Sequence, residues 1–519
     1  MPGGGLFVLV AYGAQNVLLS GNPDFTYFYK TYKKYTHFSE ESVTQPMDGI
    51  QELSIDQPIQ VRLKVQRVAD LVRDMYLVVD IPDIYCKWLD LNDPRIGRQS
   101  QLNFNWTRYL GCQLIQQIGF YIGGQKIQEF DGTYMIAKAQ TDLTNTEFEK
   151  WRRLVGDVPE FYNPATGIYA GGSLGGGYPL VYPDAPGGNI NRPSIFGREL
   201  MIPLPFWFTE STFNALPLLS MQYQECEVQI TFNPINQLYQ VLDASGQIVA
   251  PGFQQVSALP TEPTNPGYIQ SNSIYDSIGQ FLTDWTVAPP LIPTWPLNPR
   301  IQSTYIYLTD EERTKFAATP LQYVVRQITT YTFNGLLNRQ FAELRTHNPI
   351  NRLFIVPSRS DSLAYRNDVA NWTNWPLAAK APWIAPTTLY PPYVLFGEAT
   401  GKLVQVAGQR PILQTLRLLG DGNELQEEKP IEYYTDVVAW KYLKGRPDPN
   451  LIVYPFGLHT PGTQPDGSLN SSRVRLLQVD LNPYPLLADT NYSYNFTIYV
   501  ENINWVAISS GLGGLKYAL

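Results

Sequence analysis

The chain has 519 residues, a formal net charge of −8 and a charged fraction of only 16%. The low charge and the 44% hydrophobic content exclude an intrinsically disordered chain, and the length is enough for two or more domains. Because Lys30, Lys33 and Lys34 form the only dense basic cluster, we expect no direct nucleic-acid binding of the kind that neutralises phosphates. The 42 Pro, 39 Gly and 34 Tyr predict an all-β protein with long loops.

Residues 1–24 are predicted to form an N-terminal arm that leads into a first strand. Two apolar runs, Leu6–Val10 and Val17–Leu19, flank a turn at Gly13, and neither run is long enough to span a bilayer. An aromatic tract follows the arm, and we place the start of the first domain at residue 25. The members of this tract are Phe25, Tyr27, Phe28, Tyr29, Tyr32, Tyr35 and Phe38.

The cysteine content indicates a reducing compartment. An odd, sparse set of three, Cys86, Cys112 and Cys226, does not form a disulfide framework. Cys226 lies in an alternating strand pattern, which favours a buried thiol. The first residues also lack the positive region and cleavage site of a signal peptide.

Several segments in the first half show strand patterns. Residues 59–66 alternate between apolar and polar side chains, as in a half-buried strand, and residues 75–81 continue as another. Residues 114–127 are predicted to form a hairpin around Gly123-Gly124, which suits a two-residue turn with positive φ. Residues 226–232 alternate again, as in a half-buried strand.

A helix is predicted over residues 131–155. Thr144 and Glu147 have the spacing of a capping box. Phe148 and Trp151 then fall on one face at helical spacing, so we expect this face to pack on a sheet rather than to bind a ligand.

The chain is predicted to contain two β-sandwich domains. The first spans residues 25–235, and the Pro-rich residues 236–300 are interpreted as a linker and the entry to the second domain. The second domain spans residues 301–519, with its first strand at residues 301–308.

The pattern of the first domain is repeated in the second. A short capped helix at residues 309–316 precedes alternating strands at residues 321–333 and 494–500. Each domain also contains a long loop rich in Gly, Pro and Tyr, at residues 156–198 and 372–411, and connections of this length are usually functional or disordered.

The search for chemistry-bearing motifs predicts no catalytic, cofactor-binding or metal site. Residues 171–175 fit G-x-S-x-G, but they lie in a run of glycines rather than between a strand and a helix. The GEATGK stretch at 397–402 has the wrong spacing for a phosphate loop. Only three histidines occur, in separate parts of the chain, and none has a second ligand at metal-binding spacing. They are His37, His347, which is interpreted as a turn residue, and His459.

Six blocks of sequence, in the right order along the chain, resemble the major capsid proteins of nucleocytoplasmic large DNA viruses. The most specific is IVYPFGLHTPGTQPDGSLNSSRV, which is similar to the family's IYxYSFALxPxxxQPSGTxNFSRI, although Pro455 replaces a Ser and Ser471 replaces a Phe. The opening LVAYGAQNVLLSGNP and the PLPFWF stretch also match the family pattern. The six blocks are residues 3–38, 200–234, 336–356, 413–434, 452–481 and 502–519.

The resemblance implies two tandem eight-stranded jelly rolls in one subunit. Three such subunits would form a pseudo-hexagonal homotrimer, the capsomer that tiles the icosahedral shell of a large double-stranded DNA virus. Further implied partners are neighbouring capsomers, minor capsid proteins and penton proteins. The implied localisation is the virion, after assembly in the host cell cytoplasm, and no enzymatic activity or cofactor is implied.

Within this scheme the two long loops are expected at the outward end of the sandwiches, where they would clasp the trimer. The N-terminal arm is expected at the opposite, inner end, close to minor proteins or an inner membrane. Two alternatives stay open at this point. One is a minor capsid paralogue or assembly scaffold of the same fold, and the more distant one is a carbohydrate-active or carbohydrate-binding β-sandwich protein.

Overall fold

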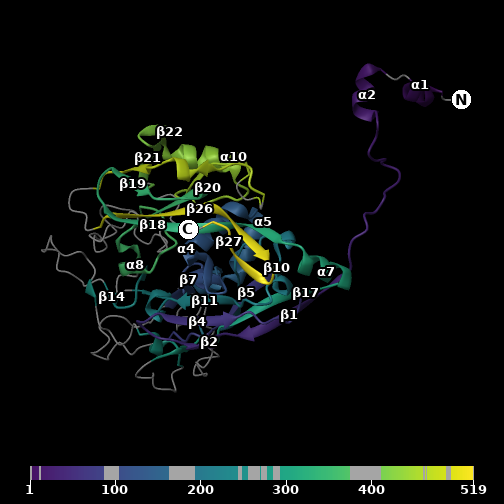
Figure 1. The fold of residues 1–519 in the computed structure, drawn as a ribbon. Helices are drawn as coiled ribbons and strands as arrows, with labels where there is room; N and C mark the ends of the chain where they lie inside the picture. The colour runs from purple at the N-terminus through teal and green to yellow at the C-terminus, as the bar shows by residue number, and fades with distance from the viewer. Residues whose placement is uncertain are drawn as a thin grey trace.

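The protein consists of two β-sandwiches packed against each other, from which an N-terminal arm projects (Figure 1). The computed structural model describes residues 3–10, 13–86, 104–162, 193–242, 248–254, 269–270, 277–283, 293–374, 411–459, 462, 464–486 and 492–517. Most of the two long loops predicted from the sequence, at residues 163–192 and 375–410, lies outside these described ranges.

The first sandwich has two antiparallel five-stranded sheets. The predicted alternation at residues 59–64 is confirmed, because Ile59, Val61 and Leu63 are buried and the residues between them are exposed. One sheet contains β1 (Phe38–Pro46), β17 (Arg300–Leu308), β5 (Leu71–Ile81), β9 (Arg198–Pro203) and β10 (Leu216–Pro217). The other contains β2 (Asp48–Gly49), β4 (Ile59–Lys64), β11 (Cys226–Phe232), β7 (Ile115–Ile122) and β8 (Gln125–Phe130).

The strand at residues 301–308 belongs to the first sandwich, which corrects its predicted place at the start of the second. β17 pairs with β1 from Phe38↔Leu308 to Pro46↔Arg300, and on its other side it pairs with β5. The physical reason is that Ile301 and Tyr305 bury their side chains in the first core. We therefore propose that the second unit begins after Leu308.

Several described segments of residues 236–300, predicted as a linker and the entry to the second domain, pair with strands of the first unit. β12 (Tyr239–Leu242) pairs with β6 (Phe104–Trp106) and β13 (Ile248–Val249). β16 (Trp295–Pro296) pairs with β3 (Glu52–Leu53), and the Trp295 side chain is fully buried against Trp106.

The predicted helix at residues 131–155 is present but divided into α4 (Gly132–Asp142) and α5 (Asn145–Leu154). Thr144 caps α5, and its reciprocal hydrogen bonds with Glu147 confirm the predicted capping box. The hairpin of β7 and β8 is also confirmed, with Gly123 and Gly124 at φ of 56° and 81°.

The N-terminal segment differs from its prediction. It forms two short helices, α1 (Gly4–Val10) and α2 (Ala14–Ser20), and the first strand begins only at Phe38. The aromatic tract at residues 25–35 therefore lies outside the first sandwich, because β1 is the first segment that finds a strand partner.

The second sandwich packs a six-stranded sheet on a four-stranded sheet. Asp421 and Gly422, both with positive φ, form the turn between β21 and β22. The larger sheet contains β18 (Leu321–Leu336), β26 (Tyr494–Ser509), β20 (Pro349–Arg359), β23 (Ile452–Pro455), β24 (Leu469–Asn470) and β27 (Leu512–Leu515). The smaller contains β19 (Gln340–Leu344), β25 (Leu477–Pro483), β21 (Leu413–Gly420) and β22 (Asn423–Pro430).

The two sandwiches have the same basic plan. Without β2 and β10, which have two residues each, the first sandwich has four strands in each sheet. Without the short β24 and β27, the second sandwich also has four strands in each sheet. The prediction of an all-β chain with two tandem eight-stranded jelly rolls is confirmed in this sense.

The sheet of β18, β26, β20 and β23 is buried on both faces. Along β26, Ile498 and Val500 belong to the core of the second sandwich, whereas Tyr499 between them belongs to the core of the first. Along β20, Phe354 likewise faces the first core and Ile355 the second. Alternate residues of one sheet therefore serve two cores, as the period of two of a strand allows.

Candidate interaction sites at the jelly-roll junction and the N-terminal arm

Helix α4 carries three of the polar groups at the junction between the two sandwiches, Tyr134, Lys138 and Asp142. The Asp131 carboxylate caps this helix by accepting a hydrogen bond from the Tyr134 backbone N–H at 2.7 Å. A Cβ at Gly132 would lie 1.9 Å from the Cys112 carbonyl oxygen, so only glycine allows the first turn to pack this closely on α3 (Leu110–Leu114). These two local features fix the helix against the first sandwich.

Arg352 on β20 joins the second sandwich to α4. The guanidinium is fully buried and makes two bidentate contacts. It donates to the Glu501 carboxylate at 2.7 and 2.9 Å, and to the Asp142 carboxylate at 2.6 and 2.8 Å. Because the planar fork of an arginine matches two carboxylates in fixed directions, this contact sets the orientation of β20 relative to α4.

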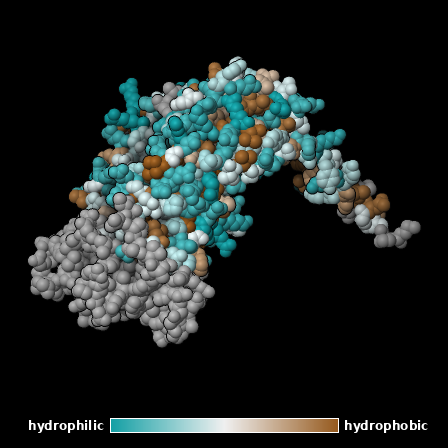
Figure 2. Space-filling view, turned by 90° about the horizontal axis from the view of Figure 1, so that it is seen from below, coloured by the Kyte–Doolittle hydropathy of each residue, from teal (hydrophilic) through white to brown (hydrophobic). Residues whose placement is uncertain are grey.

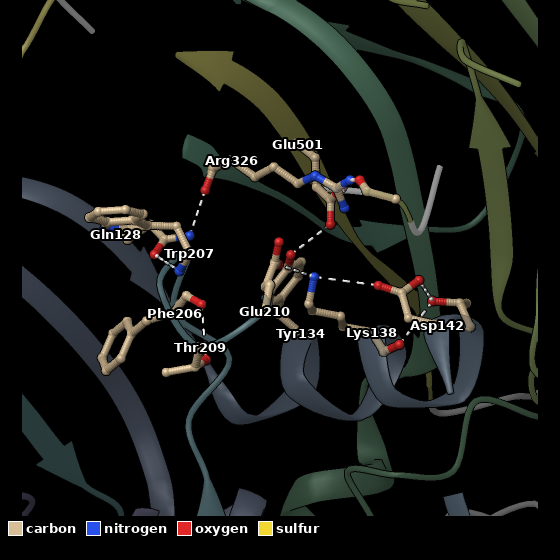
Figure 3. A network of polar contacts seen from close by, with 12 residues as sticks. Gln128, Tyr134, Lys138, Asp142, Phe206, Trp207, Thr209, Glu210, Arg326 and Glu501 are labelled. Atoms are coloured by element: carbon tan, nitrogen blue, oxygen red, sulfur yellow. Dashed lines mark hydrogen bonds and ion pairs between the residues drawn. The ribbon is translucent and has the colours of Figure 1, made fainter. Parts of the chain in front are cut away.

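The charges around Arg352 are balanced. The Lys138 amine on α4 lies 2.8 Å from a Glu210 carboxylate oxygen, and an Arg326 guanidinium nitrogen on β18 lies 3.9 Å from Glu501. Figure 3 shows Tyr134 and Lys138 pointing from α4 toward Glu501 and Asp142. The three cations are Lys138, Arg326 and Arg352, and the three anions are Asp142, Glu210 and Glu501.

Burial and charge act in opposite directions on these carboxyl groups. Burial alone would raise the pKa of Glu501, but Arg352, Lys138 and Arg326 together lower it to about 2. Burial also opposes ionisation of Asp142, yet the charges of Arg352 and Lys138 hold its pKa below the ordinary value. Glu501 and Asp142 are therefore ionised at neutral pH.

Two tyrosines complete the junction. The Tyr134 hydroxyl donates to Glu501 at 2.6 Å, and the Tyr499 hydroxyl donates to Asp131 at 2.7 and 2.9 Å. Their rings pack against each other, with ring centroids 5.7 Å apart, and Tyr134 meets Phe354 edge-on at 5.8 Å. Burial raises the pKa of Asp131, which has hydrogen-bond donors but no cation beside it.

Two glutamines join the edge strands β8 and β18 reciprocally. The Gln128 side-chain amide donates to the Arg326 carbonyl at 2.7 Å, and the Gln327 amide donates to the Ile127 carbonyl at 2.9 Å. Gln128 also accepts a hydrogen bond from the Trp207 backbone N–H at 2.9 Å (Figure 3). The edges of two sheets from different sandwiches are thereby held in one register.

Sequence reasoning did not single out Arg352, Glu501 or Asp142. A signal was nevertheless present, because Arg352 and Glu501 are the charged residues of mainly apolar strand runs, INRLFIV and TIYVENI. A charge at such a position is rarely buried unless it is paired, so each one pointed to a partner elsewhere in the chain.

The N-terminal arm presents the opposite environment. The apolar and aromatic side chains that the structure describes between Leu6 and Tyr35 are exposed, from 53% at Val17 to 99% at Phe28. The arm extends away from both sandwiches, and Figure 2 shows hydrophobic residues along it (Figures 1 and 2). Thr36 connects the end of the tract to the body by donating to Glu312 on α7 (Asp310–Ala318) at 2.9 Å. None of the described helices is long and apolar enough to cross a membrane.

The three histidines lie apart in the structure. His347 is exposed in the turn between β19 and β20, as the sequence interpretation expects, and it lines an open polar cleft of about 530 Å³ between β8 and β18. The His459 ring nitrogen Nδ1 lies 2.8 Å from Asp466, and His37 is exposed at the end of the arm. Within the described residues no group of three or more His, Cys, Asp or Glu side chains could hold a metal ion. The motifs at residues 171–175 and 397–402 lie outside the described residues.

Comparisons with known proteins match both halves of the chain. The family model described as "Major capsid protein N-terminus" matches residues 26–265, and the one described as "Large eukaryotic DNA virus major capsid protein" matches residues 312–514. The "Major capsid protein" of Phaeocystis pouchetii virus is 24% identical over 99% of both chains. The "Probable capsid protein 4" of Acanthamoeba polyphaga mimivirus is 20% identical, also over 99% of both.

The fold is also similar to that of solved structures. The chain in the quasi-atomic model of the PBCV-1 virus capsid superposes with a TM-score of 0.64 at 18% identity. The match covers 95% of this chain and all of the other.

Proposed function

Because this chain belongs to the family of large eukaryotic DNA virus major capsid proteins, we propose that it is the main structural subunit of an icosahedral capsid. The role is mechanical, and the protein needs no catalytic group for it. The localisation that follows is the virion, with assembly in the cytoplasm of the host cell.

We further propose that three copies form a homotrimeric capsomer. The supporting observation is that one chain contains two sandwiches of the same plan, each with four main strands in each sheet. Three chains therefore supply six similar wedges around a threefold axis, and such a block tiles a hexagonal lattice. A closed threefold ring uses heterologous contacts that repeat three times and then stop.

The junction supports this proposal because it makes the two wedges one rigid body. Arg352, Glu501 and Asp142 fix the relative orientation of the sandwiches, and a pseudo-hexagonal outline requires that this orientation be the same in every copy. The test is light scattering of the purified protein together with negative-stain images. A trimer with a six-cornered outline is expected, and a stable monomer at high concentration would overturn the proposal.

The partners of the trimer are neighbouring capsomers, minor capsid proteins and penton proteins. α7 and the arm lie at one end of the molecule in Figure 1, and α8 (Asp361–Arg366), which precedes the long segment 375–410, lies at the other. We therefore place the arm at the inner end of the capsomer, beside minor proteins or an inner membrane, and the long loops at the outer end.

Deletion of residues 2–22 tests this division of labour. Because the side chains of α2 are exposed and none is buried in the sandwiches, the deleted protein is expected to fold and form trimers but to assemble shells poorly. Loss of folding in the deleted protein would contradict the placement.

A second candidate function is a minor capsid paralogue or assembly scaffold. The match to a relative named "Probable capsid protein 4" supports this candidate, because the number in that name distinguishes it from other capsid proteins. Copy number in purified virions separates the two candidates. A main shell protein dominates a stained gel, whereas a paralogue is a minor band and a scaffold is absent from mature particles.

A further inference from the structure

The N-terminal arm has three properties that no segment of the two sandwiches shares. It lies away from the body, residues 1–23 contain no Asp, Glu, Lys or Arg, and an aromatic and lysine-rich tract follows directly. The family model for the N-terminal half begins to match only at residue 26.

Helix α1 contains no polar residue in its sequence GGLFVLV. Five consecutive apolar residues occupy positions 6–10, which is longer than one helical turn of 3.6 residues. The side chains of Leu6, Phe7 and Leu9 are 72% to 80% exposed. A groove on a protein partner would cover only one side of such a helix, whereas the acyl region of a bilayer surrounds it.

Helix α2 and the aromatic tract continue the same pattern toward the body. Leu18 and Leu19 are 87% and 91% exposed. Between residues 25 and 35, six aromatic side chains alternate with three lysines, and all six are at least 69% exposed. Tyrosines beside lysines are typical of the level of the lipid headgroups, where a ring is half apolar and an amine meets phosphate. The six rings are Phe25, Tyr27, Phe28, Tyr29, Tyr32 and Tyr35.

The lysines of the tract lack acidic partners in the described part of the chain. No ion pair involves Lys30, Lys33 or Lys34 among the described residues, and the Lys30 amine lies 5.7 Å from the centroid of the Tyr32 ring. The nearest acid in sequence is Asp24. Three unpaired cations on a chain whose net charge is −8 mark the one segment that an anionic surface attracts.

From these observations we propose that the arm binds the surface of an anionic lipid bilayer. α1 and α2 enter the outer part of one leaflet, and the tyrosines and lysines of residues 25–35 lie among its headgroups. Each helix has seven residues and is about 10 Å long, so it cannot cross a hydrocarbon core of about 30 Å. The proposal rests on the proposed capsid function only for the position of the arm at the inner end of the capsomer.

Vesicle flotation with the full-length protein tests the proposal. The probes are phosphatidylcholine vesicles with and without 30% phosphatidylserine, an amount chosen to give a strongly anionic surface. The protein is expected to float with the anionic vesicles and to be released at high salt. Equal binding to both kinds of vesicle, or binding to neither, would overturn the proposal.

Matched variants identify the residues responsible. The triple variant Lys30→Gln, Lys33→Gln, Lys34→Gln should bind anionic vesicles about a hundredfold more weakly, at about fivefold for each lysine. The control Lys64→Gln, Lys150→Gln, Lys441→Gln makes the same change of net charge with exposed lysines of the body and should bind normally. Equal loss in both triple variants would show a general charge effect and overturn the assignment to the arm.

Two double variants, one in the arm and one in the body, test the contribution of the arm's apolar side chains to vesicle binding. Leu18→Ser with Leu19→Ser should weaken binding at least about tenfold. Leu458→Ser with Leu512→Ser, which removes two exposed leucines of the body, should not change it. Vesicle binding unaffected by the first pair would exclude insertion of α2.

A fluorophore reports the environment of the arm directly. All three native cysteines are buried, so Gln15→Cys on α2 provides a selective labelling site. The label should move to an apolar environment only when anionic vesicles are added. If it does so without lipid and as a function of protein concentration, a second copy of the chain covers the arm instead.

The vesicle experiments and the test of the capsomer proposal can fail independently of each other. Trimers that fail to bind vesicles would refute the lipid proposal and leave the capsomer proposal intact. Monomers that bind vesicles would refute the capsomer proposal and leave the lipid proposal intact.

Discussion

The jelly-roll junction and the N-terminal arm use similar residues in opposite environments. At the junction, Tyr134 and Tyr499 are almost fully buried, and Arg352 is fully buried between two carboxylates. In the arm, Tyr27 is 90% exposed and Lys30 has no carboxylate partner among the described residues. Both regions combine tyrosines with cations, so residue type alone does not decide burial.

The two regions differ in where the interaction partners of their cations and aromatic rings lie. At the junction each cation has an anion on another element of the same chain, and the rings pack on one another. In the arm no described carboxylate pairs with the lysines, and the ring contact between Phe25 and Tyr27, at 5.1 Å, is local and leaves both side chains exposed. A sequence that leaves apolar and cationic groups uncovered in this way indicates a surface that another component covers. The four predictions below test this contrast.

The largest effect is expected for Arg352→Ala. This change leaves Asp142 and Glu501 buried without their shared cation, which should lower the free energy of unfolding by about 3–5 kcal/mol. The measurement is the urea midpoint of the purified protein. The control is Arg345→Ala, because its side chain is 84% exposed and lies 3.9 Å from Glu343, so its effect should stay below about 0.5 kcal/mol. Equal effects in the two variants would show that the network does not stabilise the junction.

The second prediction concerns pH. The folded pKa of Glu501, about 2, lies below its ordinary value, so its contribution to stability is present above about pH 4.5 and is lost as the pH falls through the folded pKa. That contribution is about 3 kcal/mol. The difference in urea midpoint between the native protein and Arg352→Ala should therefore narrow between pH 5 and pH 3 and stay constant between pH 6 and pH 8. A difference in urea midpoint that stays constant at all pH values would contradict the assignment of this pH dependence to Glu501.

A smaller effect is expected for Tyr134→Phe. The change removes the hydroxyl that donates to Glu501 at 2.6 Å and keeps the ring, so the free energy of unfolding should fall by about 1–2 kcal/mol. Tyr29→Phe makes the same chemical change in the arm, where the side chain is 74% exposed, and should have no measurable effect. Thermal unfolding of the two variants compares the regions directly.

The smallest effect is expected for Phe28→Ala. Its ring is 99% exposed, so the free energy of unfolding should change by less than about 0.5 kcal/mol. A clear loss of stability, measured by urea unfolding in the absence of lipid, would mean that the arm folds back onto the body in solution. The contrast between the two regions would then be wrong.

Local patterns predicted much of the fold because their causes are local. The alternation from Ile59 to Leu63, the Gly123-Gly124 turn and the Thr144 cap each depend on neighbouring residues only. The place of β17 was predicted wrongly because it depends on pairing with β1, about 260 residues away, and periodicity carries no information on the partner of a strand. The same limit applies to the junction, where the distance in sequence from Asp142 to Arg352 is 210 residues.

The arm shows the converse limit. Its apolar runs were interpreted as leading into a strand, since apolar side chains in a folded chain are usually covered by that chain. The described structure shows short helices without such cover. The lysines were noted for their bearing on nucleic acids, whereas their spacing among the tyrosines carried the more useful information.

The sheet that serves two cores also constrains how the protein is made. Phe354, Val356 and Tyr499 complete the hydrophobic interior of the N-terminal half, yet the ribosome synthesises them only after that half. A nascent chain that ends before β26 therefore exposes an unfinished apolar face to the cytosol. Until about residue 508 has emerged, a chaperone or another nascent chain can occupy that face, and synthesis on crowded polysomes is the stage at which misassembly has to be avoided.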